Sequence, residues 1–320
     1  MMHAYGHYFL IGVTRGDYLR FMSARIARIY PLHVLMLFFM VAIEVVRYFH
    51  GTTGSVDFVQ PFSTAERSPY SIVTNLFLVQ SLNIHDVLTW NTPAWSISTE
   101  CYVYIVFPFL VAAITRTKAA SLAMLALTLV VLAFGLTLIR QPSERVGPLD
   151  ITFAWGYFRC LIEFCLGMIV YKAYSAGLIL VSGSDALVVV VTLCLGFVLQ
   201  NHWHDVLALP LIALLILSVS RNEGAVRSFL TVPALRWLGE ASYSIYLVHV
   251  PVRDFGLMVL RRASIDIEKI SYTPIQAVGV MIVMIGVVIA LSLCTWRWFE
   301  LPARNYLKQA IKHVIPARNA

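Results

Sequence analysis

A basic segment stands directly before a long apolar run near the start of the chain. Four arginines between positions 15 and 28 precede the run Tyr30–Phe49, which is almost wholly hydrophobic. At a rise of about 1.5 Å per residue, a helix over this run crosses roughly 30 Å, the thickness of a bilayer's hydrocarbon core. Arginines at one end favour the anionic, usually cytoplasmic, face of a membrane. The run therefore predicts a spanning helix that begins at the cytoplasmic face, with Pro31 near its first turn.

Composition places the rest of the chain in the same environment. Of 320 residues, 59% are hydrophobic and 13% are charged, which is too apolar for a soluble domain of this length. The apolar blocks lack the alternating segments of about ten residues that a membrane barrel needs. We predict an all-α polytopic membrane protein, one domain over residues 1–320, with a bundle of about eight transmembrane helices. The expected spans are Tyr30–Phe49, Pro93–Thr115, Ser121–Ile139, Trp155–Tyr174, Asp185–Leu199, Val206–Ser220, Ala241–Leu260 and Ile275–Phe299.

A further apolar patch, Ser71–Val87, is interrupted by two asparagines, a glutamine and a serine. We expect it to lie along the membrane interface, or to dip in and return, because this leaves an even number of crossings. With the first arginines inside, an even number places the basic tail Arg304–Arg318 inside as well. This arrangement puts the larger share of the lysines and arginines on the inner side, as the positive-inside rule favours.

Charge and cysteine usage exclude two other classes of site. The net charge of +7 comes from residues at the ends of apolar blocks, with no basic stripe, so nucleic acid is not an expected partner. The five cysteines all lie inside apolar blocks and show no CxxC spacing, which makes a metal site and disulfides unexpected. We expect them to be small buried side chains.

Several polar residues are more than a plain membrane anchor requires. Arg25 and Arg28, three apart, can present a fork of donors to an anion, although a topology anchor explains them equally simply. In the segment that begins at Trp95, Glu100 lies just inside a predicted crossing, where a charge costs roughly 2.5–3.5 kcal/mol unless it is paired or lines water. Ser96 is four residues away and can share its face. The alternative is an interfacial tryptophan belt with a structural hydrogen-bond cluster.

Other candidates admit a structural explanation as well as a functional one. Glu44 and Arg47, and likewise Arg159 and Glu163, have helical spacing, and we expect each pair to neutralise itself. His249 lies near the middle of a predicted crossing, where a histidine is a functional candidate, yet a histidine packed against a neighbouring helix fits the same pattern.

Four separated motifs resemble the bacterial acyltransferase family 3, in the right order and over nearly the whole chain. The family consists of multispanning enzymes that move acyl groups, usually acetyl, from acyl-CoA to sugar hydroxyls. The motifs are Arg25-x-x-Arg28-Ile-Tyr-Pro31, Trp95-Ser96-Ile97-Ser98-Thr99-Glu100, Ser242-Tyr-Ser-Ile-Tyr-Leu-Val-His249 and Trp298-Phe299-Glu300-Leu301-Pro302.

The resemblance implies a ten-helix bundle, of which the eight expected crossings are the last eight. It assigns the donor's CoA end to Arg25 and Arg28, since guanidinium forks bind phosphate. A polar pocket is expected from Trp95, Ser96, Ser98 and Glu100, with His249 as a weaker catalytic candidate. Glu300 is expected to brace the last helix at the membrane interface.

In one respect the chain departs from the family pattern. The family opens with a helix that carries a basic residue and, about ten residues later, the catalytic histidine. Neither His3 nor His7 follows a spanning helix, so neither is assigned that role, and the base is expected upstream of Met1 in an N-terminally shortened member.

The sequence therefore predicts a multi-pass inner-membrane O-acyltransferase without a bound cofactor. Acyl-CoA, in particular acetyl-CoA, is the expected donor co-substrate, and the acceptor is a hydroxyl of a cell-surface or exported glycan, free or lipid-linked. The alternatives are a glycolipid transporter or flippase, which performs no chemistry, and a non-catalytic remnant of the enzyme.

Overall fold

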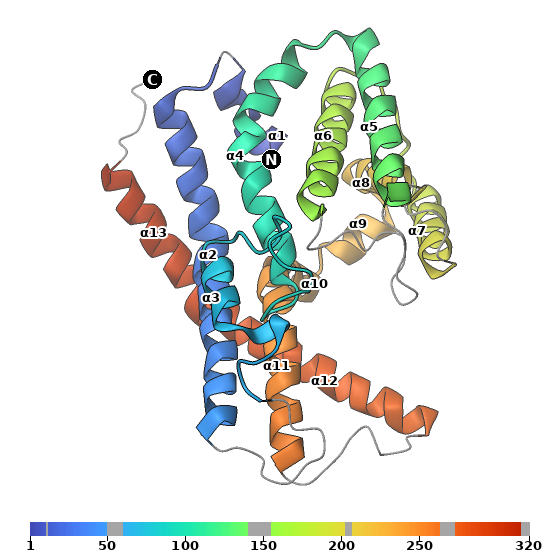
Figure 1. Cartoon of the computed structure of the whole chain (residues 1–320). Coiled ribbons are helices and arrows are strands. Elements are labelled where there is room, and N and C mark those ends of the chain that lie inside the picture. Colours follow the sequence, from blue (N-terminus) through green and yellow to red (C-terminus); the bar gives the residue numbers. More distant parts are fainter. Residues whose placement is uncertain (11, 50–59, 140–154, 202–206, 263–272, 315–320) are drawn as a thin grey trace. The chain divides into compact units, whose positions relative to one another are not determined.

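The computed structural model of the chain consists of helices and connecting turns (Figure 1). It divides into two compact units, each made of two stretches of chain. Unit 1 comprises Met1–Met22 and Thr99–Arg236, and unit 2 comprises Ser23–Ser98 and Trp237–Ala320. The structure describes residues 1–10, 12–49, 60–139, 155–201, 207–262 and 273–314.

All eight expected spans contain a helix, and no strand occurs in the described ranges. Three helical stretches are long and apolar enough to cross a membrane: α2, α4 and the run Pro274–Ile311 that begins with α12. The all-α membrane class is thus confirmed. The helices at the expected spans are α2 (Arg15–Phe49), α4 (Ala94–Arg116), α5 (Ala119–Ile139), α6 (Gly156–Ser175), α7 (Asp185–Gln200), α8 (Ala208–Ser220), α11 (Ser242–Arg262) and α12 (Pro274–Thr295).

The prediction for the start of α2 is wrong. The helix begins at Arg15 and runs for 35 residues, so Pro31 lies in its interior and not in its first turn. Thr14 starts it, because its hydroxyl accepts the N–H of Asp17 and donates to the Asp17 carboxylate at 2.6 Å. The basic segment that follows has few helix-breaking residues, and the helix continues through Pro31 at the loss of one backbone hydrogen bond.

The apolar patch Ser71–Val87 after α2 does not form a spanning helix, as expected, and its position at the membrane interface stays a prediction. After the short helix η2 (Ala65–Arg67), α3 covers only Pro69–Leu76, about 12 Å of rise. Ser68 caps its N-terminus. At its C-terminus, Tyr30 and His33 of α2 donate to the carbonyls of Leu76 and Asn75, at 3.0 and 2.8 Å.

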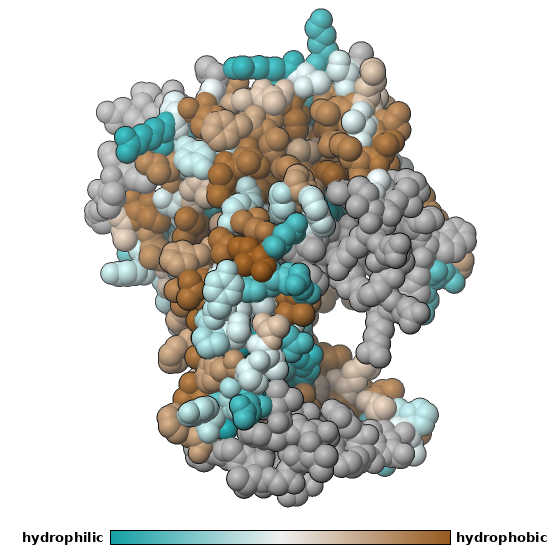
Figure 2. Space-filling model, viewed as in Figure 1, coloured by the Kyte–Doolittle hydropathy of each residue, from teal (hydrophilic) through white to brown (hydrophobic). Residues whose placement is uncertain are grey.

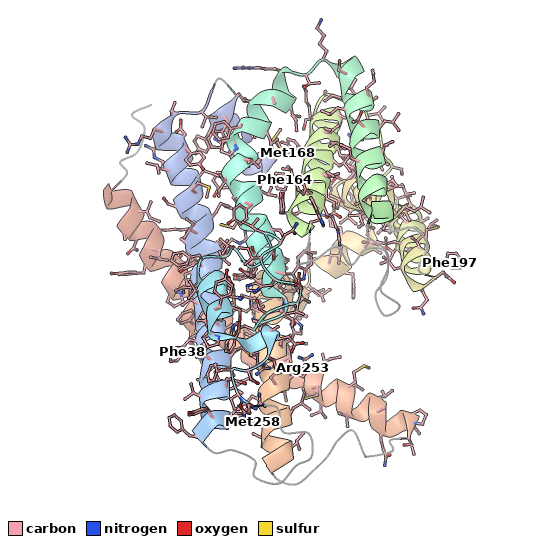
Figure 3. The ribbon with its side chains drawn as sticks, in the orientation of Figure 1. Phe38, Phe164, Met168, Phe197, Arg253 and Met258 are labelled. Atoms are coloured by element: carbon pink, nitrogen blue, oxygen red, sulfur yellow. The ribbon has the colours of Figure 1, made fainter. Side chains whose placement is uncertain are left out.

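Unit 1 is a helical layer with an aromatic core. Helix α5 packs against α6, and α8 packs against both α6 and α7. Phe21, Phe107 and Phe164 stack or meet edge to face, with ring centroids 5.1–5.7 Å apart along the chain of contacts, and Phe164 points from α6 towards α4 (Figure 3). The short elements of this unit are α1 (Met2–Tyr5), η1 (Gly6–Phe9) and α9 (Ala225–Leu230), and α10 (Pro233–Glu240) leads back to unit 2.

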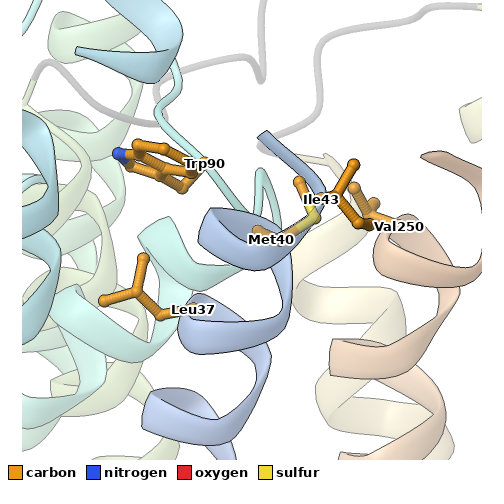
Figure 4. Close-up of a cluster of buried hydrophobic side chains, with 5 residues drawn as sticks. All are labelled: Leu37, Met40, Ile43, Trp90 and Val250. Atoms are coloured by element: carbon orange, nitrogen blue, oxygen red, sulfur yellow. The ribbon is translucent and has the colours of Figure 1, made fainter. Parts of the chain in front are cut away.

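Unit 2 has its own core, built on α2 and α11. A close-up shows Leu37, Met40 and Ile43 of α2 with Trp90 and Val250, all buried (Figure 4). Helix α12 packs on α11 but is otherwise little covered, with 6% of its most apolar window buried. Apolar side chains cover much of the visible surface (Figure 2), as expected for a protein surrounded by lipid. The chain then passes through η5 (Trp296–Glu300) into α13 (Leu301–Val314).

Candidate functional site

Arg25 and Arg28 lie on the part of α2 that belongs to unit 2. Their spacing of three residues places them on neighbouring positions of one helix face. Arg28 is exposed and Arg25 is half-buried. The hydroxyl of Tyr243 donates to the carbonyl of Ile29, so α11 is fastened to the same turn of α2. The turn that carries the two arginines is therefore held in place by a neighbouring helix.

A π-helix positions the buried carboxylate of Glu300. Pro302 lacks the N–H that would continue the α-helical ladder, and its ring crowds the carbonyl four residues earlier. In the π-helix η5 the N–H of Leu301 instead donates to the carbonyl of Trp296, five residues back. This places Glu300 in the interior at 4% exposure, where Ser244 of α11 donates to its Oε2 at 2.6 Å.

Two arginines from different helices attract Glu300. Arg304 of α13 and Arg28 of α2 both interact with its carboxylate electrostatically. Residues of three predicted motifs, Arg28, Ser244 and Glu300, therefore meet in unit 2, although Glu300 was expected only to brace the last helix. We call Arg28, Glu300 and Arg304 the arginine–glutamate cluster. Two guanidinium groups and one carboxylate leave an excess of positive charge, and Arg25 adds a further guanidinium one turn before Arg28 on α2, which suits a phosphorylated ligand.

The motif around Trp95 begins helix α4, and its serines are used in packing. Ser98 is buried, and its hydroxyl donates to the carbonyl of Leu78 at 2.5 Å and accepts the N–H of Ser81. The hydroxyls of Ser96 and Tyr246 lie 2.9 Å apart, and the Trp95 carbonyl accepts the hydroxyl of Ser81. These bonds tie the start of α4 to α11 and to the segment after α3. The expected pocket role of Trp95, Ser96 and Ser98 stays a prediction.

Glu100 and His249 lie in different surroundings. Glu100 belongs to unit 1, where the hydroxyl of Tyr104, one turn later on α4, donates to its carboxylate. His249 of unit 2 is exposed, and its Nδ1 lies 2.7 Å from the carbonyl of Tyr246, so this nitrogen carries the hydrogen. Their expected site roles remain predictions.

An ion network lies at the other end of α2 and α11 from the arginine–glutamate cluster. The predicted pair of Glu44 and Arg47 is confirmed, at 2.8 Å, and Glu44 is 2% exposed. Arg67, far away in sequence, bridges Glu44 at 2.9 Å and Asp254 at 2.5 Å. Arg253 of α11, labelled in Figure 3, pairs with the same aspartate. The network joins α2, η2 and α11, so its charges serve the packing of unit 2.

Unit 2 also contains a buried set of polar side chains that none of the predicted motifs indicates. His33, Asn75, Gln80, Thr89 and Asn91 are all at most 5% exposed, and we call these five residues the polar core. Asn75 donates to the Thr89 hydroxyl at 2.7 Å and Asn91 donates to the Leu247 carbonyl at 3.0 Å. That carbonyl is available because Pro251, four residues later, has no N–H to offer it. The polar residues that interrupt the patch Ser71–Val87 were the signal for this core.

Fold and site together define a class: an all-α integral-membrane protein that presents an excess of guanidinium groups beside a buried carboxylate and a polar interior. Comparison with known proteins makes this specific. A family model described as "Acyltransferase domain" matches residues 8–296. The chain belongs to this family, acyltransferase family 3, and its long apolar helices are those of a membrane protein.

One curated relative is similar to part of the chain. "Protein 2 in picA locus" of Rhizobium radiobacter is 30% identical over 110 residues, which cover 33% of this chain and 56% of that protein. The chain thus spans little more than half the length of this relative. No solved structure matches the chain.

Proposed function

We propose that this membrane protein is an acyltransferase that takes an acyl group, in particular acetyl, from acyl-CoA and transfers it to a hydroxyl of a cell-surface or exported glycan. The observation that carries the proposal is the family match over residues 8–296, which contains the Arg25-x-x-Arg28 turn. A thioester needs no further activation. The transfer requires a base for the acceptor hydroxyl and donors for the oxyanion.

Arg25 and Arg28 bind the phosphates of CoA in this proposal. CoA is polyanionic, and a guanidinium group can hold a phosphate with two parallel hydrogen bonds. The electrostatic attraction between Arg28 and the Glu300 carboxylate supports the assignment, because it places this arginine within the charged region that Arg304 also joins. The excess positive charge of the arginine–glutamate cluster remains for the ligand. Salt weakens such binding by screening.

The acceptor side draws on the residues at the start of α4. Trp95 offers a ring of the kind that stacks on sugars, and Ser96 and Tyr246 offer hydroxyls at the half-buried and exposed faces of unit 2. We propose Glu100 and Ser98 as further pocket residues and His249 as a lesser candidate. We propose the inner membrane of a bacterium as the location, and the basic turn of α2 favours a cytoplasmic position for the donor.

Donor binding provides the first test. The chain is placed in lipid nanodiscs, and binding of acetyl-CoA is measured by calorimetry. Arg25→Ala combined with Arg28→Ala should weaken Kd at least about 10-fold, since each charge-assisted bond contributes about 1.5–3 kcal/mol. Arg227→Ala, which removes an exposed arginine of α9, is the matched control and should leave Kd unchanged. Equal Kd values for the double variant and the unaltered chain would remove the donor role.

Transfer provides the second test. Membranes that contain the chain are incubated with radiolabelled acetyl-CoA and a bacterial glycan fraction, and label in the glycan is counted. The proposal expects label in the glycan together with free CoA. A flippase would instead move the glycolipid without consuming acetyl-CoA. A non-catalytic remnant would insert normally and yield no labelled glycan.

A further inference from the structure

The segment between α8 and α11 consists mainly of two short helices that the rest of the described chain leaves uncovered. Neither α9 nor α10 contains a buried residue. Large apolar side chains nevertheless occur along the segment and are exposed, namely Phe229 (65%), Leu230 (43%), Val232 (39%) and Trp237 (59%). Burying one such side chain contributes about 1.5–3 kcal/mol. Several of them in one segment therefore indicate a surface that covers them.

Helix α10 has one apolar face and one polar face. With about 3.6 residues per turn, its apolar side chains fall within one half of the helix circumference, and Arg236 lies opposite the middle of that half. The apolar face consists of Ala234, Leu235, Trp237 and Leu238. Leu235 and Leu238 are half-buried, whereas Ala234 and Trp237 are exposed. Part of this face is thus covered within the chain, and the other part is open.

Helix α9 repeats this pattern. Val226, Phe229 and Leu230 are three and four residues apart and share one face, and Ser228 lies on the other side. Two amphipathic helices with open apolar faces therefore follow one another along the chain. Helices with phenylalanine, leucine or tryptophan on one face and basic residues on the other lie in the plane of a membrane interface.

The start of α9 is fixed to the start of α7. Asp185, the first residue of α7, accepts the N–H groups of Ala225 and Val226 at 2.9 and 3.1 Å. Gly224 permits this approach, since a Cβ atom there would lie 2.4 Å from Oδ2 of the same aspartate. Because α7 is an apolar helix that we expect to cross the membrane, its first residue marks the bilayer surface. Helix α9 is therefore held at that surface.

The end of α10 is joined to the start of α11. Only Ala241 separates the two helices, and its N–H donates to the carbonyl of Trp237 at 2.9 Å. Trp237 is thus at most about 8 Å of helical rise from the first residue of α11. That end of α11 lies beside the turn of α2 that carries the paired arginines, since Tyr243 donates to the carbonyl of Ile29. Trp237 therefore belongs to the same membrane face as these arginines.

The charges of the segment favour an anionic surface. Between α8 and α11 there are three arginines and two glutamates, all exposed, which leaves one positive charge in excess. They are Arg221, Arg227, Arg236, Glu223 and Glu240. Arginine and tryptophan accumulate at the inner membrane interface, where each basic residue near anionic lipid contributes about 1 kcal/mol. A water-soluble anion fits less well, because it offers nothing to the apolar faces.

We propose that α9 and α10 form an interfacial anchor that binds the anionic phospholipid surface of the inner leaflet. The open apolar faces enter the boundary between headgroups and acyl chains, with Arg236 within reach of lipid phosphates. The anchor keeps the first turn of α11 at a fixed depth, and that turn holds the arginine-bearing turn of α2 through Tyr243. The inference is independent of the acyl-transfer reaction.

The depth of a fluorescent label tests which face of α10 is covered. Ala234→Cys and Gly239→Cys place single thiols on the apolar and polar sides, in a chain whose five native cysteines are replaced by serine. Gly239 has nothing within 4 Å of a new Cβ, so the substitution fits. Each thiol is labelled with nitrobenzoxadiazole in nanodiscs that contain phosphatidylglycerol, and equal melting temperatures verify the fold.

Doxyl lipid should quench the label at position 234 at least about 3-fold more strongly than iodide in the water does, and the label at position 239 should show the reverse. Leu230→Cys and Ser228→Cys make the same comparison on α9. Equal iodide quenching on both faces would overturn the inference. A label at position 234 that neither quencher reaches would overturn it as well, because a protein surface would then cover the face.

Lipid titration tests the charge. Phosphatidylglycerol is added to the chain in neutral detergent, and bound lipid is counted by native mass spectrometry. Arg236→Gln should weaken the apparent Kd about 5-fold, the equivalent of about 1 kcal/mol. Arg236→Lys keeps the charge and should retain the Kd, and phosphatidylcholine should bind equally to all three chains. An unchanged Kd in Arg236→Gln would reject the anionic lipid. Displacement of the lipid by excess inorganic phosphate would assign the arginine to a soluble anion and reject it too.

Discussion

At the scale of single residues, Lys172 of α6 binds the carbonyl groups at the C-terminal end of α4. Its Nζ donates to the carbonyls of Ile114, Thr115 and Thr117 at 2.7, 3.0 and 2.6 Å. These are among the carbonyls that the C-terminal turn of α4 leaves without helical partners. A single ammonium thus uses all three of its donors on one helix end.

Lys172→Met should therefore destabilise unit 1. The variant keeps the apolar stem and removes the three charge-assisted bonds, so we expect a loss of about 1–3 kcal/mol in the free energy of unfolding. Thermal denaturation in nanodiscs measures it. Lys118→Met removes an exposed lysine near the same helix end and should change the melting temperature little. Similar melting curves for both variants would show that the three bonds contribute nothing net.

Gly183 is required by space and not by its backbone angles. A Cβ atom at this position would lie 2.2 Å from the carbonyl oxygen of Arg221, a backbone atom that cannot rotate away. Gly183→Ala should force the loops before α7 and after α8 apart and cost about 1–3 kcal/mol. Gly196→Ala, in α7 with nothing within 4 Å of the new Cβ, should stabilise the helix by up to about 1 kcal/mol. Urea or thermal melts that rank the two variants in the opposite order would contradict this explanation.

Local spacing predicts contacts within one helix, and it does so reliably here. The pair Arg159 and Glu163, four residues apart, forms at 2.8 Å as expected. Contacts between distant residues follow from tertiary packing, which no spacing encodes: Arg67 and Asp254 are 187 positions apart. The hydrogen bond of His33 to the carbonyl of Asn75, in another helix, could not be predicted from the sequence for the same reason.

At the scale of elements, the apolar pattern predicts which segments are helical better than where each begins. Helix α7 was expected over Asp185–Leu199 and covers Asp185–Gln200. Helix α2 begins 15 residues before the predicted Tyr30. The prediction missed its first half because that half is polar, and an apolar pattern cannot reveal a polar helical segment. Helix α3 was expected not to cross, since polar residues interrupt its patch, and it does not.

The π-helix η5 is the element that controls the arginine–glutamate cluster. In Pro302→Ala the N–H of residue 302 can donate to the carbonyl of Trp298, and an unbroken α-helix becomes available. The change in winding would turn Glu300 away from Ser244 and Arg28. We expect unchanged helical content by circular dichroism and an acetyl-CoA Kd raised several-fold.

Pro274→Ala is the matched control for this experiment. Pro274 stands at the first position of α12, where a proline removes no helical hydrogen bond. Its replacement should leave both helical content and Kd unchanged. If Pro302→Ala also keeps the Kd of the unaltered chain, the π-helix has no part in donor binding.

At the scale of the whole molecule, two compact units share their longest helices. Helix α2 passes from unit 1 to unit 2 at Met22, and α4 passes from unit 2 to unit 1 after Ser98. The expectation of a single domain stays a prediction.

The direction of the chain in the membrane is the property on which the donor site depends. CoA is made and used in the cytoplasm, so Arg25 and Arg28 can bind it only if their end of α2 lies there. The apolar part of α2, between these arginines and Ser63, is long enough to cross the membrane, and we expect one crossing there. An even number of crossings returns Lys308 of α13 to the side of the arginines.

Cysteine labelling of intact cells tests this direction. Ser63→Cys and Lys308→Cys place single thiols at exposed positions in a chain whose five native cysteines are replaced by serine. A membrane-impermeant maleimide should label Ser63→Cys in intact spheroplasts, and should label Lys308→Cys only after the membrane is opened. Labelling of Lys308→Cys from outside would reject the even number of crossings. Protection of Ser63→Cys, with Lys308→Cys labelled, would place the arginines outside and end the donor assignment, since CoA could not reach them.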